Sequence, residues 1–178
     1  QSFSQKALVV GANHLDPDGF SFVILEDIPN GEIIYITDRE YNNVTNVFNT
    51  GEAIVVFTAT SAITKGTVVY VKEVASNTLT VTCTGGACGT VSLIGTTFSF
   101  STSGEGFYAY GDTDNDPTNG VTEIYSVFFT LAGSVPPGEN PLPDFPSAIV
   151  VDGFVSATPN RTEYMFNPAS VRDGVSQA

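Results

Sequence analysis

The residues best suited to chemistry lie in one acidic segment, 111–116, which reads Gly-Asp-Thr-Asp-Asn-Asp. Alternate residues of such a loop can turn their oxygens toward one point, and calcium takes six to eight oxygen ligands. When Asp112 is counted as position one, the next two aspartates fall at positions three and five, and Glu123 falls at position twelve, where an EF-hand places a bidentate glutamate. The spacing predicts a calcium site formed by Asp112, Asp114, Asp116 and Glu123.

Two features of this segment separate it from an EF-hand. Position six holds Pro117 and not the glycine that the sharp turn needs, and the flanking residues favour strands over helices. A calcium loop of another geometry is one interpretation. A solvated turn is the alternative, because Asp and Asn side chains favour turns through their own hydrogen bonds.

A second acidic group surrounds two apolar strand candidates, Phe20–Leu25 and Ile33–Thr37, which a short turn joins. If these strands pair as a hairpin, Asp18 and Asp38 lie at the same end of the sheet, where a weak cation site would be conceivable. Loop carboxylates left in water are the alternative, because Asp and Glu mostly stay exposed.

The two cysteines, Cys83 and Cys88, are separated by Thr-Gly-Gly-Ala and flanked by strand-like residues. We expect them to face each other across a hairpin and to form a disulfide, which fits an oxidising compartment. The loop that they close is short, so we expect the bond mainly to hold the turn. Two cysteines and one remote histidine do not supply the four ligands of a structural zinc site.

Covalent catalysis has few candidate residues in this sequence. His14 is the only histidine, so a hydrolase triad would depend on it, and no serine lies in a G-x-S-x-G element. A carboxylate pair for glycoside hydrolysis stays open, because only the spatial separation of the two groups would reveal it. We therefore interpret the protein as non-enzymatic.

Several aromatic residues have two interpretations. They could form a surface platform on which sugars stack, or they could belong to the core or to cross-strand pairs, and the second interpretation is favoured for any one of them. These residues are Tyr35, Tyr41, Phe48, Tyr108, Tyr110 and Tyr125.

Strand patterns with turn punctuation recur along the whole chain, and no segment has a convincing helical period. The expected strands are Ala7–Gly11, Phe20–Glu26, Ile33–Asp38, Ala53–Thr58, Thr67–Val74, Leu79–Cys83, Val91–Leu93, Phe98–Ser101, Phe107–Tyr110, Glu123–Phe129, Ala148–Val151 and Tyr164–Phe166. The continuous apolar run Val68–Val71 is typical of a strand covered on both faces. We predict a single all-β domain over residues 1–178, an Ig-like β-sandwich, with a closed sheet as the alternative. The proline-rich segment Gly133–Pro146 is expected to cross the sandwich as an extended loop.

The composition limits the classes of partner. The chain has 178 residues, with 19 Asp and Glu against 6 Lys and Arg, for a net charge of −13. This charge argues against nucleic acid and anionic membranes as partners, and no apolar run is long enough to span a bilayer. It fits an exterior protein or one that captures cations, although solubility alone is a sufficient explanation.

An ordered succession of short motifs resembles a family of β-domains from secreted and cell-surface bacterial proteins, notably flavobacterial and cyanobacterial ones. In chain order these motifs are Phe20–Val23, Asp27–Pro29, Ile34–Asp38, Thr50–Glu52, Gly66–Val69, Ser103–Glu105, Ala109–Tyr110, Leu142–Pro143 and Ala148–Val151. Tyr41 stands where the family pattern has tryptophan. The resemblance implies extracellular placement at a cell surface and a sandwich remotely similar to lamin-tail domains, and it implies no activity.

These observations predict a structural or adhesive protein that assembles into a homo-oligomer or polymer, as a filament, sheath or layer. The N-terminal strand candidate, formed by Lys6, Ala7, Leu8, Val9 and Val10, could pair with the next subunit by strand addition. Closure of its own sheet by the same strand is the alternative. A calcium-dependent carbohydrate-binding module, with glycans as its ligands, is the alternative function.

Overall fold

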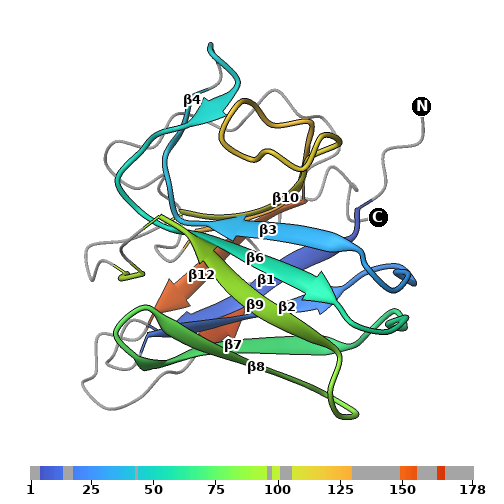
Figure 1. Cartoon of the computed structure of the whole chain (residues 1–178). Helices are drawn as coiled ribbons and strands as arrows, with labels where there is room; N and C mark the ends of the chain where they lie inside the picture. The colour runs from blue at the N-terminus through green and yellow to red at the C-terminus, as the bar shows by residue number, and fades with distance from the viewer. Residues whose placement is uncertain are drawn as a thin grey trace, which may run out of the picture.

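Two large β-sheets and a small hairpin make up the part of the chain that the computed structural model describes, which is residues 5–13, 18–42, 44–95, 98–100, 106–129, 149–155 and 164–166 (Figure 1). Within these ranges there is no helix, and hence no long apolar helix of the kind that crosses a bilayer. The predicted all-β sandwich is confirmed at this level. The predicted crossing loop 133–146 and His14 lie outside the described residues.

The four-stranded sheet is antiparallel throughout, with the order β1-β2-β7-β8. Its strands are β1 (Ala7–Asn13), β2 (Gly19–Ile24), β7 (Val68–Ala75) and β8 (Thr78–Cys83). The seven-stranded sheet has the order β13-β12-β11-β10-β3-β6-β9, and in it β11 and β12 pair in parallel. Its strands are β3 (Ile33–Thr37), β6 (Ile54–Ala59), β9 (Gly89–Ile94), β10 (Gly106–Gly111), β11 (Glu123–Phe129), β12 (Ile149–Val155) and β13 (Tyr164–Phe166).

The main core lies between the two sheets. Side chains alternate along a strand, so β2 turns Phe20, Phe22 and Ile24 toward the core while its other residues face outward. Phe22 meets Phe57 of β6 edge to face, with ring centroids 5.4 Å apart, and both rings are fully buried. Because the two rings belong to different sheets, this contact joins the two layers.

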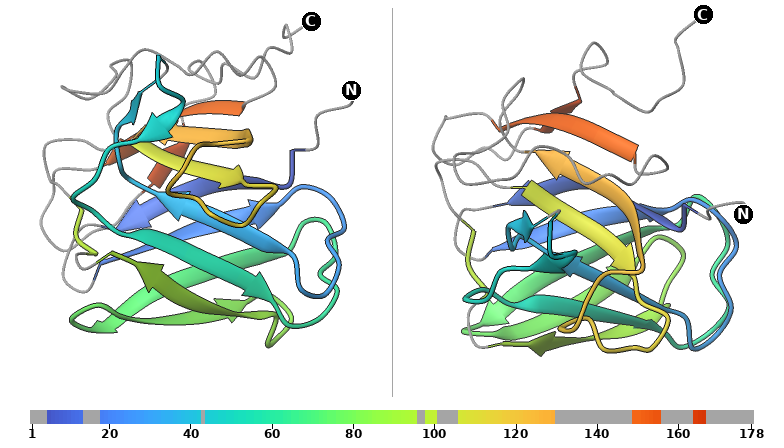
Figure 2. Two further views of the ribbon diagram at one scale, coloured as in Figure 1. Left: turned by 45° about the horizontal axis from the view of Figure 1, so that its top comes forward. Right: turned by 90° about the horizontal axis from the view of Figure 1, so that it is seen from above.

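A second core covers the other face of the seven-stranded sheet. The hairpin of β4 (Tyr41–Asn42) and β5 (Val47–Phe48) and the loop 112–122 lie on this face, on the side away from β7 and β8 (Figure 1). In the left view of Figure 2 this loop runs beside β10. The strand β10 is consequently buried on both faces along its whole length. Its continuous apolar sequence follows from this double coverage.

The run Val68–Val71 does not have the predicted double coverage. Val69 and Val71 are buried, but Tyr70 between them is 47% exposed on the outer face of the four-stranded sheet. The prediction is wrong because no layer covers this face among the described residues. Large β-branched and aromatic side chains favour strands whether or not both faces are buried.

Phe98–Phe100 is not a strand, contrary to the prediction for Phe98–Ser101, whose last residue is not described. The backbone amide of Phe98 donates to Asn77 Oδ1 at 2.9 Å, and that of Phe100 donates to Asp18 Oδ2 at 3.0 Å. Side chains therefore replace the neighbouring strand as acceptors. The alternation of the two phenylalanines still has its packing consequence, because both rings are buried and lie 4.8 Å apart at the centroids.

Two strand pairs that were predicted to form hairpins, β2 with β3 and β8 with β9, belong to different sheets, so the turns between them connect the two sheets. β2 pairs with β1 and β7, whereas β3 pairs with β6 and β10, so Asp18 and Asp38 do not share a sheet end. Likewise β8 belongs to the smaller sheet and β9 to the larger one. The Cys83–Cys88 disulfide forms as predicted, with the Cα atoms 6.1 Å apart, but it joins two layers across a corner and does not hold a hairpin.

We expect the double variant Cys83→Ala/Cys88→Ala to lose about 2 kcal/mol of unfolding free energy, since the closed loop is short. Urea titration of both proteins, with and without reductant, measures this loss. Reductant should destabilise the wild type to the level of the double variant and leave the variant unchanged. Equal stability of the oxidised wild type and the variant would show that the bond adds nothing to the corner.

Candidate functional site

The acidic loop between β10 and β11 is held by hydrogen bonds to its own aspartates. Asp114 accepts from the Asp116 amide and from Asn119 Nδ2, both at 3.0 Å. Asp116 Oδ1 accepts from the amide of Thr118 at 3.1 Å. These two aspartates thus act as turn acceptors, which was the alternative interpretation of the motif.

Asp112 has a different environment. Its Oδ1 accepts from Thr122 Oγ1 at 2.6 Å, while its Oδ2 is buried without a hydrogen-bond donor. Burial raises the pKa of Asp112, and the Asp114 carboxyl group within hydrogen-bonding reach raises it further. The Asn119 amide lowers the pKa of Asp114, so Asp112 is the weaker acid of the pair.

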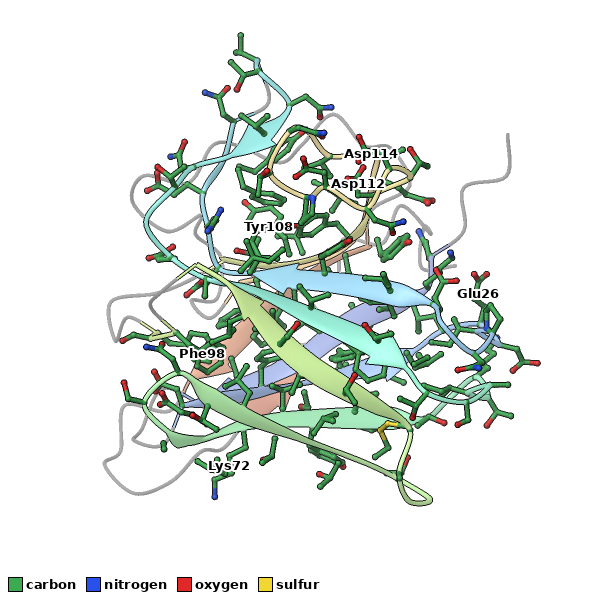
Figure 3. All side chains as sticks on the ribbon, viewed as in Figure 1. Glu26, Lys72, Phe98, Tyr108, Asp112 and Asp114 are labelled. Carbon is green, nitrogen blue, oxygen red and sulfur yellow. A yellow bond between two sulfur atoms is a disulfide. The ribbon has the colours of Figure 1, made fainter. Side chains whose placement is uncertain are left out.

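A pocket of about 300 Å³ opens beside this loop, where the beginning of β3, the end of β10 and the beginning of β11 meet. Antiparallel pairing sets Gly111 opposite Glu123, which brings Asp112 and Glu123 to one wall. Glu32 and Lys6 form a further part of the wall and are joined by an ion pair of 2.5 Å. The pocket is acidic, because it is lined by three carboxylates, those of Asp112, Glu123 and Glu32, and by one ammonium group, that of Lys6 (Asp112 is labelled in Figure 3).

Tyr125, which the sequence offered only as a platform or core aromatic, lies on the wall of this pocket. The side chain is 2% exposed, yet it lines the pocket, and its hydroxyl lies so close to Gly111 that a Cβ there would overlap it. Burial raises the pKa of Tyr125, and the charges of Glu123, Glu32 and Glu26 add to this effect. The phenol is therefore protonated at neutral pH. The sequence shows only a glycine at the end of an aromatic strand, which gives no sign of this contact.

The four predicted calcium ligands do not lie around one point in the structure. Asp112 and Glu123 line the pocket, whereas Asp114 and Asp116 are exposed in the loop and do not. Among the described residues, no group of three or more His, Cys, Asp or Glu side chains is arranged to hold a metal ion. Asp18, from the second acidic group, caps the amide of Phe100.

The aromatic residues considered for a sugar platform are buried, so the core interpretation, which the sequence favoured for each of them, is confirmed. Tyr35 and Tyr110 stack with centroids 5.3 Å apart, and Phe48 lies 4.8 Å from Tyr110. The most exposed of the six aromatic residues, Phe48, is only 7% exposed. They are covered because the β4–β5 hairpin and the acidic loop fold over this face of the sheet.

The N-terminal strand lies in its own sheet, which is the alternative to strand addition. Residues of β1 pair with β2 from Ala7 opposite Ile24 to Asn13 opposite Gly19. The Val9 amide also donates to Ser126 Oγ of β11 at 3.3 Å. Exchange of Lys6–Val10 between copies stays a prediction.

Comparisons of this chain with protein-family models, with curated proteins and with solved structures found no match. The resemblance to bacterial surface domains therefore stays a prediction.

We expect Asp112→Asn to raise the melting temperature at about pH 7 and to have little effect at about pH 3. Because the folded-state pKa of Asp112 is raised, the ionised carboxylate destabilises the fold above that pKa, and the penalty disappears as the pH falls through it. Asparagine keeps the oxygen that accepts from Thr122. Thermal unfolding followed by circular dichroism at both pH values measures the effect, with the exposed Asp116→Asn as the control. A lower melting temperature for Asp112→Asn at neutral pH would contradict the expectation.

Proposed function

We propose that this protein is a secreted, non-enzymatic structural protein of a bacterial surface that assembles with further copies of itself. The motif succession that resembles bacterial surface domains supports the location, and the disulfide fits an oxidising compartment. The assembly is carried by one observation, which is the unequal distribution of charge over the two sides of the fold.

The outer face of the four-stranded sheet has no acidic residue among the outward side chains of its described strands, although the chain has a net charge of −13. Its rows follow from the register, for example Ser21 beside Tyr70 beside Thr82. Tyr70 and Val74 are large apolar side chains exposed by 47% and 56%. A face that has two exposed large apolar side chains and no acidic residue, on an otherwise acidic protein, is a surface suited to association.

The acidic loop lies on the other side of the molecule. In Figure 3, Lys72 projects from the four-stranded sheet at one end of the view, and Asp112 and Asp114 lie toward the other end. A contact between two different faces is heterologous, and repeated contacts of this kind build filaments or rings.

Light scattering and negative-stain microscopy over a range of concentrations test the assembly. We expect regular polymers from the wild type and loss of these polymers in Tyr70→Glu, because the new carboxylate introduces negative charge into the acid-free face. Val44→Glu, at a residue that is 89% exposed on the β4–β5 turn, is the matched control and should assemble normally. A wild-type protein that stays monomeric at all concentrations would overturn the proposal.

Calcium at the acidic loop is a second proposal, favoured by the buried Asp112 Oδ2 beside the Asp114 carboxyl group. A calcium ion between the two carboxylates would remove their repulsion and stabilise the loop. We expect calcium to raise the melting temperature of the wild type above its value in chelator, and to have no such effect on Asp112→Asn. An identical melting temperature of the wild type in both solutions would exclude this role.

A further inference from the structure

We propose that the pocket around Tyr125 receives an ammonium group, and that this group is the Lys72 side chain of a neighbouring copy. The inference rests on the proposed self-assembly and assigns the two surfaces that meet in it. The occupant is a second copy of this chain, because the acid-free face and the acidic pocket have complementary charge.

The pocket has the chemistry of a cation receptor. Asp112 and Glu123 lie on its wall, while the charge of Glu32 is offset by its ion pair with Lys6. The pocket has a volume of about 300 Å³, which is room for several water molecules. Its carboxylates therefore surround an open space and are not gathered tightly around one metal ion. A space of this size suits an organic cation, such as the end of a lysine side chain.

The Tyr125 hydroxyl is an independent sign of a ligand. The hydroxyl has no hydrogen-bond partner in the described part of the chain, although only 2% of the side chain is exposed. Unlike the Tyr110 hydroxyl, which is fully buried without a partner among the described residues, the Tyr125 hydroxyl is accessible from the pocket, so a group that enters the pocket can bond to it. Because the hydroxyl lies against Gly111 on the pocket wall, it can accept a hydrogen bond from an ammonium group there.

Lys72 is the cation best placed to supply that group. The described residues contain four cations, namely Lys6, Arg39, Lys65 and Lys72. Lys6 is paired with Glu32, and Arg39 is 8% exposed and donates from Nε to the Glu52 carbonyl at 2.7 Å. Lys65 lies beside the Asp27 carboxyl group, because the backbone amide of Lys65 donates to Asp27 Oδ1 at 2.8 Å.

The strand register surrounds Lys72 with residues that carry no charge. Its partners across the sheet are Gly19 on β2 and Thr80 on β8, and Tyr70 lies on the same face. The side chain is exposed and extends away from β7 (Figure 3). An unscreened ammonium on an acid-free face is complementary to the acidic pocket, and complementarity of this kind sets the register of an interface.

Two complementary variants test the contact by sedimentation velocity. Lys72→Gln removes the ammonium, Glu123→Gln removes one carboxylate of the pocket, and Lys65→Gln is the matched control. We expect each of the first two to weaken association by roughly thirtyfold or more, and the control to assemble as the wild type does. An equimolar mixture of Lys72→Gln and Glu123→Gln should form dimers that do not grow, because only one intact contact joins each pair.

A further variant separates the contact from folding. Tyr125→Phe should keep the melting temperature of the wild type, because the hydroxyl has no partner to lose, and should weaken association about tenfold. If the wild type assembles and these variants assemble equally well, the Lys72 contact is wrong while self-assembly stands. If the wild type does not assemble at all, both proposals fail.

Discussion

Replacing Phe57 by alanine is expected to lower the free energy of unfolding by roughly 3–5 kcal/mol, the largest effect of any single change that we consider. The ring is fully buried at the centre of the main core and meets Phe22 of the opposite sheet edge to face. Truncation removes the apolar contacts and leaves a cavity between two sheets whose strands limit its collapse. The loss is a large part of the total stability of a domain of this size.

Urea titration followed by far-UV circular dichroism measures this effect. Tyr70→Ala is the matched control, because it also truncates a large aromatic side chain on a strand, but one that is 47% exposed on the outer face. We expect the control to change stability far less than Phe57→Ala does. A loss below about 1 kcal/mol for Phe57→Ala would mean that the two sheets do not share this core.

Phe48→Ala is expected to have the second largest effect, a loss of roughly 3–5 kcal/mol. Phe48 packs the β4–β5 hairpin on the aromatic layer together with Tyr41, with centroids 5.1 Å from Tyr108 and 4.8 Å from Tyr110. Without this ring, the hairpin loses its contacts with Tyr108 and Tyr110 of the seven-stranded sheet. The tyrosines beneath it then become accessible to water.

Near-UV circular dichroism reports on the tyrosines, and urea titration reports on stability. Val44→Ala, on the exposed turn of the same hairpin, should leave both unchanged. Because Phe48 and Phe57 belong to different cores, the losses in the double variant should add to within about 0.5 kcal/mol. Strong non-additivity would show that the two layers form one cooperative core.

The sequence predicts most of the strands correctly because side-chain alternation and turn residues are local signals. The strand candidates Phe20–Leu25 and Ile33–Thr37 are confirmed as β2 (Gly19–Ile24) and β3 (Ile33–Thr37), and Cys83 and Cys88 form the predicted disulfide. The acidic loop is also located correctly between two strands. Its three aspartates favour a turn whatever else they bind, so their pattern does not distinguish a turn from a metal site.

Local signals do not specify which sheet a strand joins. The turn after β2 has the residues of a hairpin, yet Ile28 pairs with Ile63 and the chain passes to the other sheet. The two-residue strands β4 and β5 are too short to produce a period. Phe98 and Phe100 alternate like residues of a strand. Their backbone amides, however, donate to the side chains of Asn77 and Asp18, which lie 21 and 82 positions away in the sequence.

By itself, the sequence determines the all-β class, the disulfide, the acidic loop and the strong negative charge, because each depends on composition or on residues close together in the chain. Tertiary structure decides the pairing of the sheets, the burial of the aromatic layer and the pocket that joins Asp112, Glu123, Glu32 and Tyr125. These features depend on contacts between distant segments. The same aromatic strand is a surface platform or a core depending on whether another segment folds over it, and no local pattern specifies that contact.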